Sequence, residues 1–204
     1  MTTQAADAAT EPQAAPSGLS LHNDRYLGFS LMYPSAWHQF QWLDGRRGVL
    51  YGPVFNDNRT IFAVAVQDLG IVVNHEDLKD LHVGFIAGIG RLIESRIESQ
   101  REWHSGGQLG MEAHYTYREG TVVRKRWVRV IYQDTRQFTI TAQAATVDEF
   151  EEWLPTFQAA MKNFRVYAKP QYKERKPAPA PETVTAESAP VVEDTPADQE
   201  STAS

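Results

Sequence analysis

Residues 26–37 read Tyr-Leu-Gly-Phe-Ser-Leu-Met-Tyr-Pro-Ser-Ala-Trp, and this short run sets the architecture of the chain. Phe29 and Leu31 alternate with less apolar neighbours, and this period of two predicts a β-strand over residues 26–33 with one buried face. Pro34 ends the strand because its nitrogen has no hydrogen to donate to a neighbouring strand. The folded part of the chain therefore opens on a sheet.

Three further strands are predicted immediately downstream. Residues 38–43 and 48–51 flank Asp44-Gly45, which is typical of a hairpin turn. Residues 60–69 read Thr-Ile-Phe-Ala-Val-Ala-Val-Gln-Asp-Leu and are apolar almost throughout. A run that is apolar on both faces indicates a strand in the interior of a sheet.

A meander of strands is predicted in the second half of the chain. The expected strands span residues 97–105, 108–118, 121–133 and 137–145. The turns between them are marked by Gly106-Gly107, Glu119-Gly120 and Asp134-Thr135. Short turns between successive strands predict antiparallel pairing.

A helix is predicted between the two groups of strands, beginning at Asn74. Its apolar residues recur at helical spacing, at Leu78, Leu81, Phe85, Ile89 and Leu92. Gly84, Gly88 and Gly90 lie inside this helix, where each costs about 1 kcal/mol relative to alanine. We expect close approach of the helix backbone to the sheet to compensate for that cost.

A second helix is predicted after the last strand. Thr146 and Glu149 have the spacing of a capping box. One face carries Phe150, Trp153, Leu154, Phe157, Ala160, Met161 and Phe164. Pro155 is expected to kink this helix or to shift its start, because proline cannot donate the backbone hydrogen bond.

These elements predict an α+β domain in which helices pack on an antiparallel sheet. We place the domain at residues 19–168. Residues 1–18 and the Pro/Ala-rich residues 169–204 are expected to be disordered tails, since they have too few apolar side chains to offset chain entropy of about 1–2 kcal/mol per residue.

The charge of the chain is concentrated in one tail. The formal net charge is −6. Residues 177–204 hold six acids and no Lys or Arg, residues 1–18 add −2, and residues 19–176 hold 18 acids and 20 bases. Residues 19–176 are thus slightly basic, at +2, which is too low to favour a nucleic-acid partner.

At this point the sequence resembles the PsbP-like family. The resemblance rests on residues 26–37 with their Tyr-Pro-x-x-Trp ending, on Gly52-Pro53 after a strand, on Glu76-Asp77-Leu78 at a helix start, and on a helix closing at Phe164. It implies an αβα sandwich around an antiparallel sheet. It also implies a non-catalytic accessory or binding protein, since the family includes a photosystem II subunit, a Ran-binding transport factor and bacterial lipoproteins. No catalytic residue is common to the family.

The residues themselves provide no catalytic or cofactor-binding motif. The absence of cysteine excludes disulfides, thiolate metal sites and a cysteine nucleophile. There is no Gly-x-Ser-x-Gly elbow and no phosphate-binding glycine loop. The six histidines (residues 22, 38, 75, 82, 104 and 114) lack the spacing of metal ligands. We therefore predict neither an enzyme, nor a cofactor, nor a metal.

A basic cluster is the most suggestive local feature. It consists of Arg118, Arg124, Lys125, Arg126, Arg129 and Arg136. A Glu119-Gly120 turn would place His114 opposite Lys125 and Glu112 opposite Trp127, on the face away from the predicted core. We predict Lys125, Trp127 and Arg129 as partner-binding residues, because an exposed tryptophan among bases is a good interface anchor. The alternative is that a helix or loop covers Trp127 and the charges only solvate the sheet.

Two functions remain open. The first is a protein-binding accessory module with a protein partner of unknown identity, whose acidic tail (residues 177–204) could shield Lys125 and Arg129. The second is a carrier or enzyme that holds a small apolar ligand between sheet and helix, lined by Tyr33, Trp37, Tyr115 and Tyr117. No run approaches the ~20 apolar residues of a membrane helix and no signal peptide is visible, so a cytoplasmic location without membrane insertion is expected.

Overall fold

The computed structural model describes residues 18–55 and 57–167. Apart from Gly18, both predicted tails lie outside the described residues, and so does the proposed shielding by residues 177–204. The described elements form an α+β fold of antiparallel sheets with two helices packed against them, as predicted.

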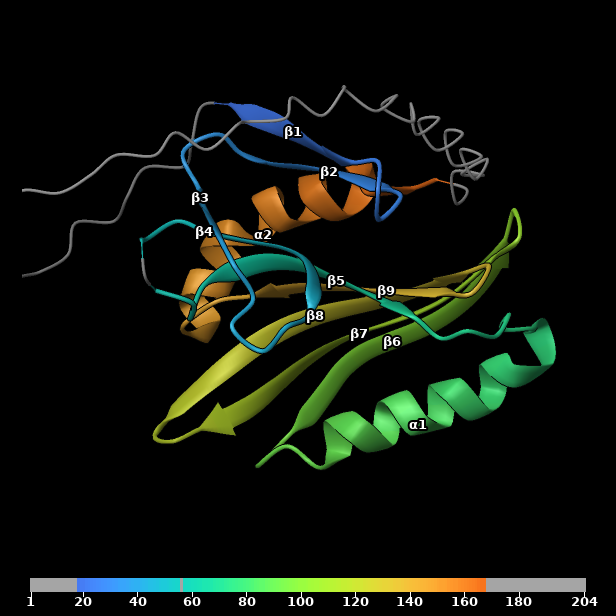
Figure 1. Cartoon of the computed structure of the whole chain (residues 1–204). Coiled ribbons are helices and arrows are strands. Elements are labelled where there is room, and N and C mark those ends of the chain that lie inside the picture. Colours follow the sequence, from blue (N-terminus) through green and yellow to red (C-terminus); the bar gives the residue numbers. More distant parts are fainter. Residues whose placement is uncertain (1–17, 56, 168–204) are drawn as a thin grey trace, which may run out of the picture. The chain divides into compact units, whose positions relative to one another are not determined.

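The large sheet has seven antiparallel strands (Figure 1). Their order across the sheet is β3 (His38–Phe40), β4 (Arg47–Gly52), β5 (Ile61–Asp68), β9 (Arg136–Gln143), β8 (Val122–Gln133), β7 (Gln108–Glu119) and β6 (Arg96–Ser105). All seven strands were predicted to within a few residues. The interior position expected for residues 60–69 is confirmed, because β5 pairs with β4 and β9.

A second, three-stranded sheet was not predicted. It consists of β1 (Leu19–Asp24), β2 (Phe29–Pro34) and β10 (Arg165–Val166), with β2 in the middle. The sequence does not reveal β1 and β10, because β1 is half polar and partly exposed and β10 is only two residues long. Both strands depend on β2, whose side chains Phe29 and Leu31 are fully buried.

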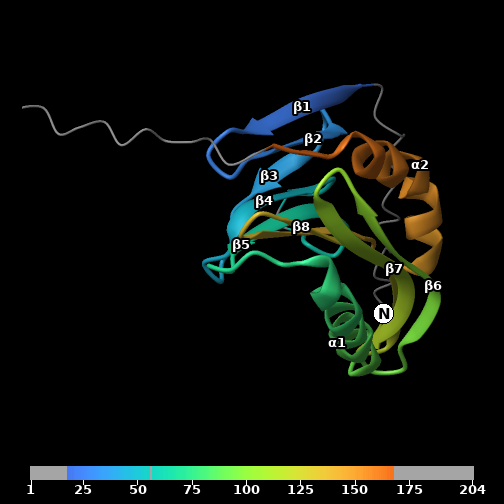
Figure 2. The same ribbon diagram turned by 90° about the vertical axis from the view of Figure 1, so that its right-hand side faces the viewer.

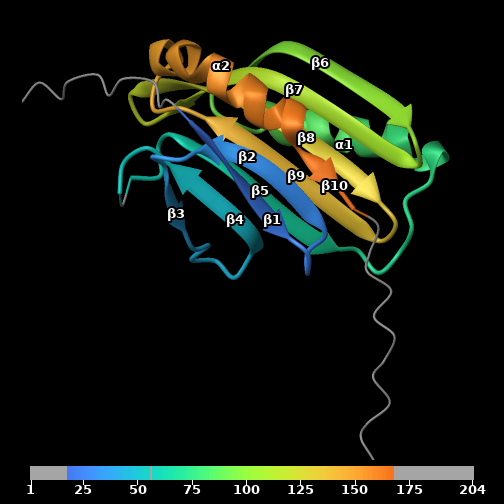
Figure 3. The ribbon, with the colours of Figure 1, turned by 90° about the horizontal axis from the view of Figure 1, so that it is seen from above.

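The elements are arranged in layers around the large sheet. Helix α2 (Val147–Asn163) and the small sheet cover one face, and helix α1 (Leu78–Gly90) lies on the other (Figures 1 and 2). From above, β1 and β2 run beside α2 over the strands of the large sheet (Figure 3). A short 3₁₀ turn, η1 (His75–Asp77), precedes α1. Each face of the large sheet therefore has its own core.

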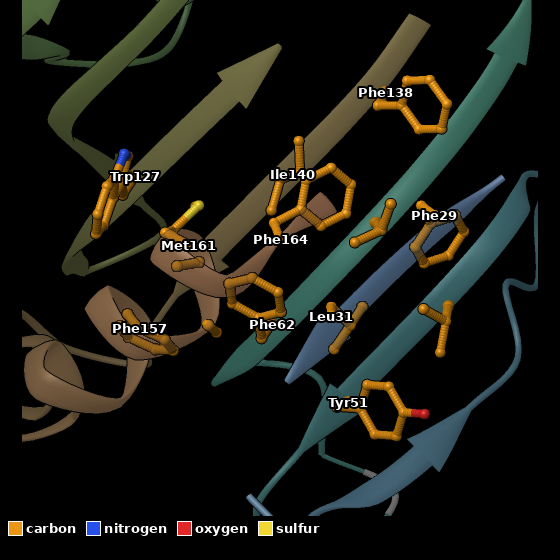
Figure 4. Packing of buried hydrophobic residues seen from close by; sticks show 14 of the residues in the cluster. Phe29, Leu31, Tyr51, Phe62, Trp127, Phe138, Ile140, Phe157, Met161 and Phe164 are labelled. Atoms are coloured by element: carbon orange, nitrogen blue, oxygen red, sulfur yellow. The ribbon is translucent and has the colours of Figure 1, made fainter. Parts of the chain in front are cut away.

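The larger core lies on the α2 side (Figure 4). The ring of Phe29 on β2 meets that of Phe138 on β9, with 6.5 Å between ring centroids. Phe157 and Met161 of α2 are fully buried in the same cluster. This aromatic core holds the small sheet and α2 onto the large sheet.

Helix α2 begins where the sequence predicts. Thr146 is the N-cap, and its hydroxyl accepts a hydrogen bond from the backbone N–H of Glu149 at 3.1 Å. The carboxylate of Glu149 accepts a hydrogen bond from the hydroxyl of Thr60. The helix continues through Pro155, so the expectation that Pro155 could shift the helix start is wrong.

The expected role of the α1 glycines is also wrong. A Cβ atom added at Gly84, Gly88 or Gly90 would have nothing within 4 Å, so these residues do not mediate close approach to the sheet. Only Leu78 and Ile89 of α1 are fully buried. All three glycines are exposed.

The strand registers follow the predicted faces with one shift. His104 pairs with Leu109 and His114 with Ser99, as expected. On the other side of β7, His114 pairs with Trp127 and not with Lys125, because the turn residues are Gly120-Thr121 and not Glu119-Gly120. A shift of two residues leaves every side chain on its predicted face.

Candidate functional site

The predicted partner-binding surface is covered by α2. Trp127 is only 7% exposed and belongs to the core, where its ring stacks on that of His114 with 4.4 Å between centroids. The expectation that Trp127 lies on a solvated face is therefore wrong, and the alternative of a covering helix is the arrangement found. The alternation of β8 identifies the face of Trp127, but it cannot tell that α2 packs on that face.

Lys125 and Arg129 fasten α2 to the sheet. The Nζ atom of Lys125 lies 2.6 Å from a carboxylate oxygen of Glu151 on α2 and 2.9 Å from one of Glu98 on β6. Arg129 donates a hydrogen bond of 2.9 Å to the backbone carbonyl of Met161, near the end of α2. Both bases thus have partners within the domain, which leaves them less available to a protein partner than expected.

Glu112 compensates the charge of Arg129 beneath α2. Its carboxylate forms ion pairs with Arg101 at 2.6 Å and with Arg129 at 2.7 Å. Burial raises the pKa of Glu112, but the hydrogen bonds and charges of the two arginines outweigh burial and hold the pKa below its ordinary value. This carboxylate stays ionised at neutral pH and stabilises the contact between sheet and helix.

An apolar groove lies on the opposite face, between α1 and the large sheet. We call it the α1 groove. Its cavity volume is about 650 Å³. It is lined by Leu69, Ile71, Val73, Asp77, Asp80, Leu81, Gly84, Phe85, Val130, Tyr132 and Gln137. The groove exists because α1 packs on β6 and β7 and leaves the neighbouring part of β8 and β9 beside it.

Ile71 is exposed within the lining of the α1 groove, and two further large apolar side chains are exposed on the segments that form it. Ile71 is 68% exposed, Val72 58% and Val83 62%. Ile71 and Val72 belong to the linker between β5 and α1, and Val83 lies on α1. Exposed apolar side chains gathered at one place mark an interaction surface, whereas single ones need no explanation.

Two carboxylates line the same groove. Asp77 accepts a hydrogen bond of 2.9 Å from the backbone N–H of Asn74 and so caps the helix. Asp80 forms no ion pair with any base in the described part of the chain. The groove therefore combines an apolar floor with an uncompensated negative charge.

The lining predicted for an apolar ligand is not found. Tyr33 stacks on Tyr51 at 3.9 Å and Trp37 packs against Trp153 at 5.0 Å, both on the α2 side of the sheet. Tyr115 and Tyr117 belong to the core beneath α1 and do not line the groove. Sequence reasoning missed Ile71 and Val73. Their signal is a run of apolar residues beyond the predicted end of a strand, at a position where a solvated loop would be polar.

No metal centre is evident in the residues that the structure describes. No group of three or more His, Asp or Glu side chains there could hold a metal ion. The rings of His75 and His104 stack with 5.0 Å between centroids, and His82 lies 3.3 Å from a carboxylate oxygen of Glu102. These contacts join the start of α1 and its first turns to β6. None of the helices in residues 18–55 and 57–167 is long and apolar enough to cross a membrane.

The fold is similar to that of a solved PsbP structure, and two further solved structures align more weakly. The solution structure of cyanobacterial PsbP (CyanoP) from Synechocystis sp. PCC 6803 aligns with a TM-score of 0.58 and 16% identity, over 78% of this chain and 99% of that one. The Ran-binding protein Mog1p of Saccharomyces cerevisiae aligns with a TM-score of 0.48 and 10% identity, over 74% and 99% of the two chains. LpqN of Mycobacterium tuberculosis, involved in cell envelope biogenesis, gives a TM-score of 0.49 and 11% identity over 76% and 87%.

The comparison with CyanoP confirms the predicted PsbP-like fold. The sequence matches no protein-family model and no curated protein. At this level of identity the similarity establishes the fold alone, and function has to be argued from the surface of this chain.

Proposed function

We propose that this chain is a non-catalytic accessory module that binds a protein partner in the α1 groove. The observation that carries the proposal is an apolar groove of about 650 Å³ whose lining includes Ile71, a side chain that is 68% exposed. Burying such side chains contributes about 25 cal/mol per Å² of apolar surface removed from water. The PsbP-like fold is compatible with this role but does not by itself assign it.

The charge of the groove defines the chemistry of the partner. The floor accepts apolar side chains, and Asp80 has no base to pair with in the described residues. A partner segment that carries two or three apolar residues and an adjacent Lys or Arg would satisfy both features. The apolar contacts provide affinity, and the charge orients the segment and favours encounter.

Site-specific crosslinking tests the location of the partner. A photoreactive amino acid in place of Ile71 should crosslink to a partner in native lysate, and the crosslinked peptide should be apolar with a basic residue. The matched control is the same amino acid in place of Glu152, which is exposed on α2. Equal crosslinking from both positions, or a crosslinked peptide without apolar residues, would contradict the proposal.

A synthetic peptide of the crosslinked sequence then tests the contacts. Fluorescence anisotropy should show binding that Ile71→Asp weakens by about tenfold, because a charge is placed in the apolar floor. Asp80→Asn should weaken binding by about threefold, which is typical of an exposed ion pair. The control Glu152→Gln should leave the affinity unchanged.

A small apolar ligand is the second candidate. The observation that favours it is the volume of the groove, which falls within the range of about 300–1,000 Å³ seen for ligand pockets. Native mass spectrometry of freshly purified protein distinguishes the two functions. A co-purifying ligand that Ile71→Asp removes would support the carrier, and an unliganded mass would count against it.

The cytoplasmic location stays a prediction. Immunoblotting of fractionated cells, with antibodies against the purified protein, would test it. Recovery of the protein in an envelope or extracellular fraction would contradict it.

A further inference from the structure

One base of the predicted basic cluster on β7, β8 and β9 has no acidic partner among the described residues. Of the six bases that cluster in the sequence, five form ion pairs with carboxylates, namely Arg118, Arg124, Lys125, Arg129 and Arg136. Arg126 pairs with none of the carboxylates in the described part of the chain. The cluster that first suggested a basic surface is thus almost neutralised, and a single positive charge remains at Arg126.

The guanidinium of Arg126 is held by neutral groups. Its Nε donates a hydrogen bond of 2.8 Å to Oε1 of Gln143, and its Nη2 donates one of 2.7 Å to the hydroxyl of Tyr117. Its carbon Cζ lies 4.7 Å from the centre of the Tyr117 ring. The Nε2 of Gln143 donates in turn to the backbone carbonyl of Arg59 at 3.0 Å. Gln143 and Tyr117 are buried, so the guanidinium is fixed in orientation.

Two hydrogen-bond donors, Nη1 of Arg126 and the hydroxyl of Tyr115, lie side by side. The Nη1 of Arg126 has only one contact, at 3.5 Å, to the hydroxyl oxygen of Tyr115. The hydroxyl hydrogen of Tyr115 has no acceptor among the residues that the structure describes. Two neighbouring donors, one of them charged, match the two oxygens of a carboxylate.

The surroundings strengthen the attraction for an anion. Arg126 is half-buried, and a charge in a partly dehydrated position interacts more strongly than one in bulk water. Arg124 lies two residues away on the same face of β8, and its partner Glu119 is largely exposed. A half-buried cation without an anionic partner is costly to the free protein, and a bound carboxylate would remove that cost.

We propose that Arg126 and Tyr115 form a binding site for a carboxylate group, either of a small organic acid or of an acidic side chain in a peptide. This site differs from the α1 groove. Arg126 and Val130 lie on the same face of β8, four residues or about 13 Å apart. Because the groove is proposed to take a basic segment and this site takes an acid, one proposal can fail without the other.

An NMR titration tests the site directly. The Nε–Hε resonance of Arg126 in the full ¹⁵N-labelled chain is followed as sodium acetate, acetyl-Gly-Glu-Gly-amide or inorganic phosphate is added. We expect saturable shifts with acetate and with the Glu peptide, and none with the matched acetyl-Gly-Gln-Gly-amide or with sodium chloride at equal ionic strength. The tighter of the two carboxylate probes identifies the source of the acid.

Variants assign the shifts to the two side chains. Arg126→Gln should raise the Kd for the Glu peptide at least tenfold, and Tyr115→Phe should raise it about threefold. Arg126→Lys keeps the charge but loses the paired N–H donors of the planar guanidinium, and we expect the Kd for the Glu peptide to be about fivefold higher. Arg46→Gln is the control, since Arg46 is an exposed arginine paired with Asp44, and it should leave the Kd unchanged. If Arg126→Gln does not fold, Arg126→Lys and Tyr115→Phe give the same test.

Three results would overturn the proposal. The first is the absence of a saturable shift with either carboxylate up to 100 mM, where roughly 1.4 kcal/mol of binding free energy would give half-saturation. The second is a shift produced by phosphate alone, which would assign a different anion. The third is a Kd that is the same in Arg126→Lys, Tyr115→Phe and the unmodified chain.

Discussion

Charged residues of β7 and β8 bind within the domain, although the alternation of these strands suggested a solvated face. Glu112 is buried and lies between Arg101 and Arg129, and Arg129 reaches the carbonyl of Met161. A buried carboxylate is tolerated because two guanidinium groups replace the water that it loses. At this scale the sequence reveals which residues share a face, but the identity of the group that covers the face depends on a helix some thirty residues away.

The stability of the protein should depend on pH through Glu112. Its pKa in the folded protein lies below the ordinary value of 4.5, so the carboxylate stabilises the fold above that pH, and this contribution is lost as the pH falls below 4.5. Glu112→Gln should cost about 3 kcal/mol at pH 7 and much less at pH 3. Urea denaturation at both pH values measures the difference.

The control is Glu94→Gln, which removes an exposed ion pair with Arg118 and should lower the free energy of unfolding by at most about 1 kcal/mol. Equal costs for Glu112→Gln at pH 7 and pH 3 would contradict the assignment.

Gly28 should tolerate no side chain. It has a φ of +80°, and a Cβ atom there would lie 2.2 Å from Nη1 of Arg136. This Nη1 donates a hydrogen bond to the carbonyl of Leu27, and Nη2 of the same side chain donates one to the carbonyl of Tyr167. Gly28→Ala should therefore strain the backbone at this positive φ and displace Arg136 from the carbonyls of Leu27 and Tyr167. We expect the free energy of unfolding to fall by about 3 kcal/mol or more. Gly45→Ala is the matched control, since its φ is +76° but nothing lies within 4 Å, and it should cost only about 1–2 kcal/mol. Guanidinium denaturation measures both variants. An equal loss of unfolding free energy in the two would contradict the prediction, because it would show that Arg136 can move aside without destabilising the protein.

The two helices differ in how well the sequence predicts them. The apolar stripe and the cap of α2 specify both its bounds and its buried face, because Thr146 and the aromatic residues act locally. For α1, the stripe is predicted but the degree of burial is not, since α1 packs on β6 and β7 and leaves the α1 groove open. The apolar residues Ile71 and Val73 lie in a linker without periodicity, so no pattern assigns them to a groove.

Removing a glycine from α1 should stabilise the protein. Gly88 lies inside the helix with open space around it, so an alanine there makes no clash in the folded protein. The alanine also reduces the conformational entropy of the unfolded chain. Gly88→Ala should raise the free energy of unfolding by about 1 kcal/mol. Gly110→Ala is the contrasting variant, because a Cβ atom there would lie 2.1 Å from the ring of Trp103, and it should destabilise the protein in the same thermal melts. A destabilised Gly88→Ala variant would imply that α1 needs flexibility at this position.

At the scale of the whole molecule, local patterns predicted most of the fold. Alternation and turn residues specified the large sheet. The turn at Gly120 lies one residue later than predicted, which moves the pairing of β7 and β8 by two residues and leaves each side chain on its predicted face. The small sheet could not be predicted, because β1 and β10 become strands only by pairing with β2 across the domain. The expectation that Trp127 lies on a solvated face was wrong because the packing of α2 on β8 is also a contact across the domain. Trp127 has the composition of an interface anchor, but the interface that it forms is with α2.

The net charge of the chain should affect acidic and basic partners in opposite directions. Residues 177–204 carry all of the net charge of −6, so a chain that ends at residue 176 has a net charge of zero. At 10 mM salt, where the Debye length is about 30 Å, this truncation should raise the affinity for the Glu peptide at Arg126 and lower it for a basic peptide in the α1 groove. Both differences should fade by about 0.5 M salt, and calorimetric titrations at the two salt concentrations measure them. The same direction of change for both peptides would exclude long-range electrostatics as the cause, since a single change in net charge cannot attract opposite charges alike.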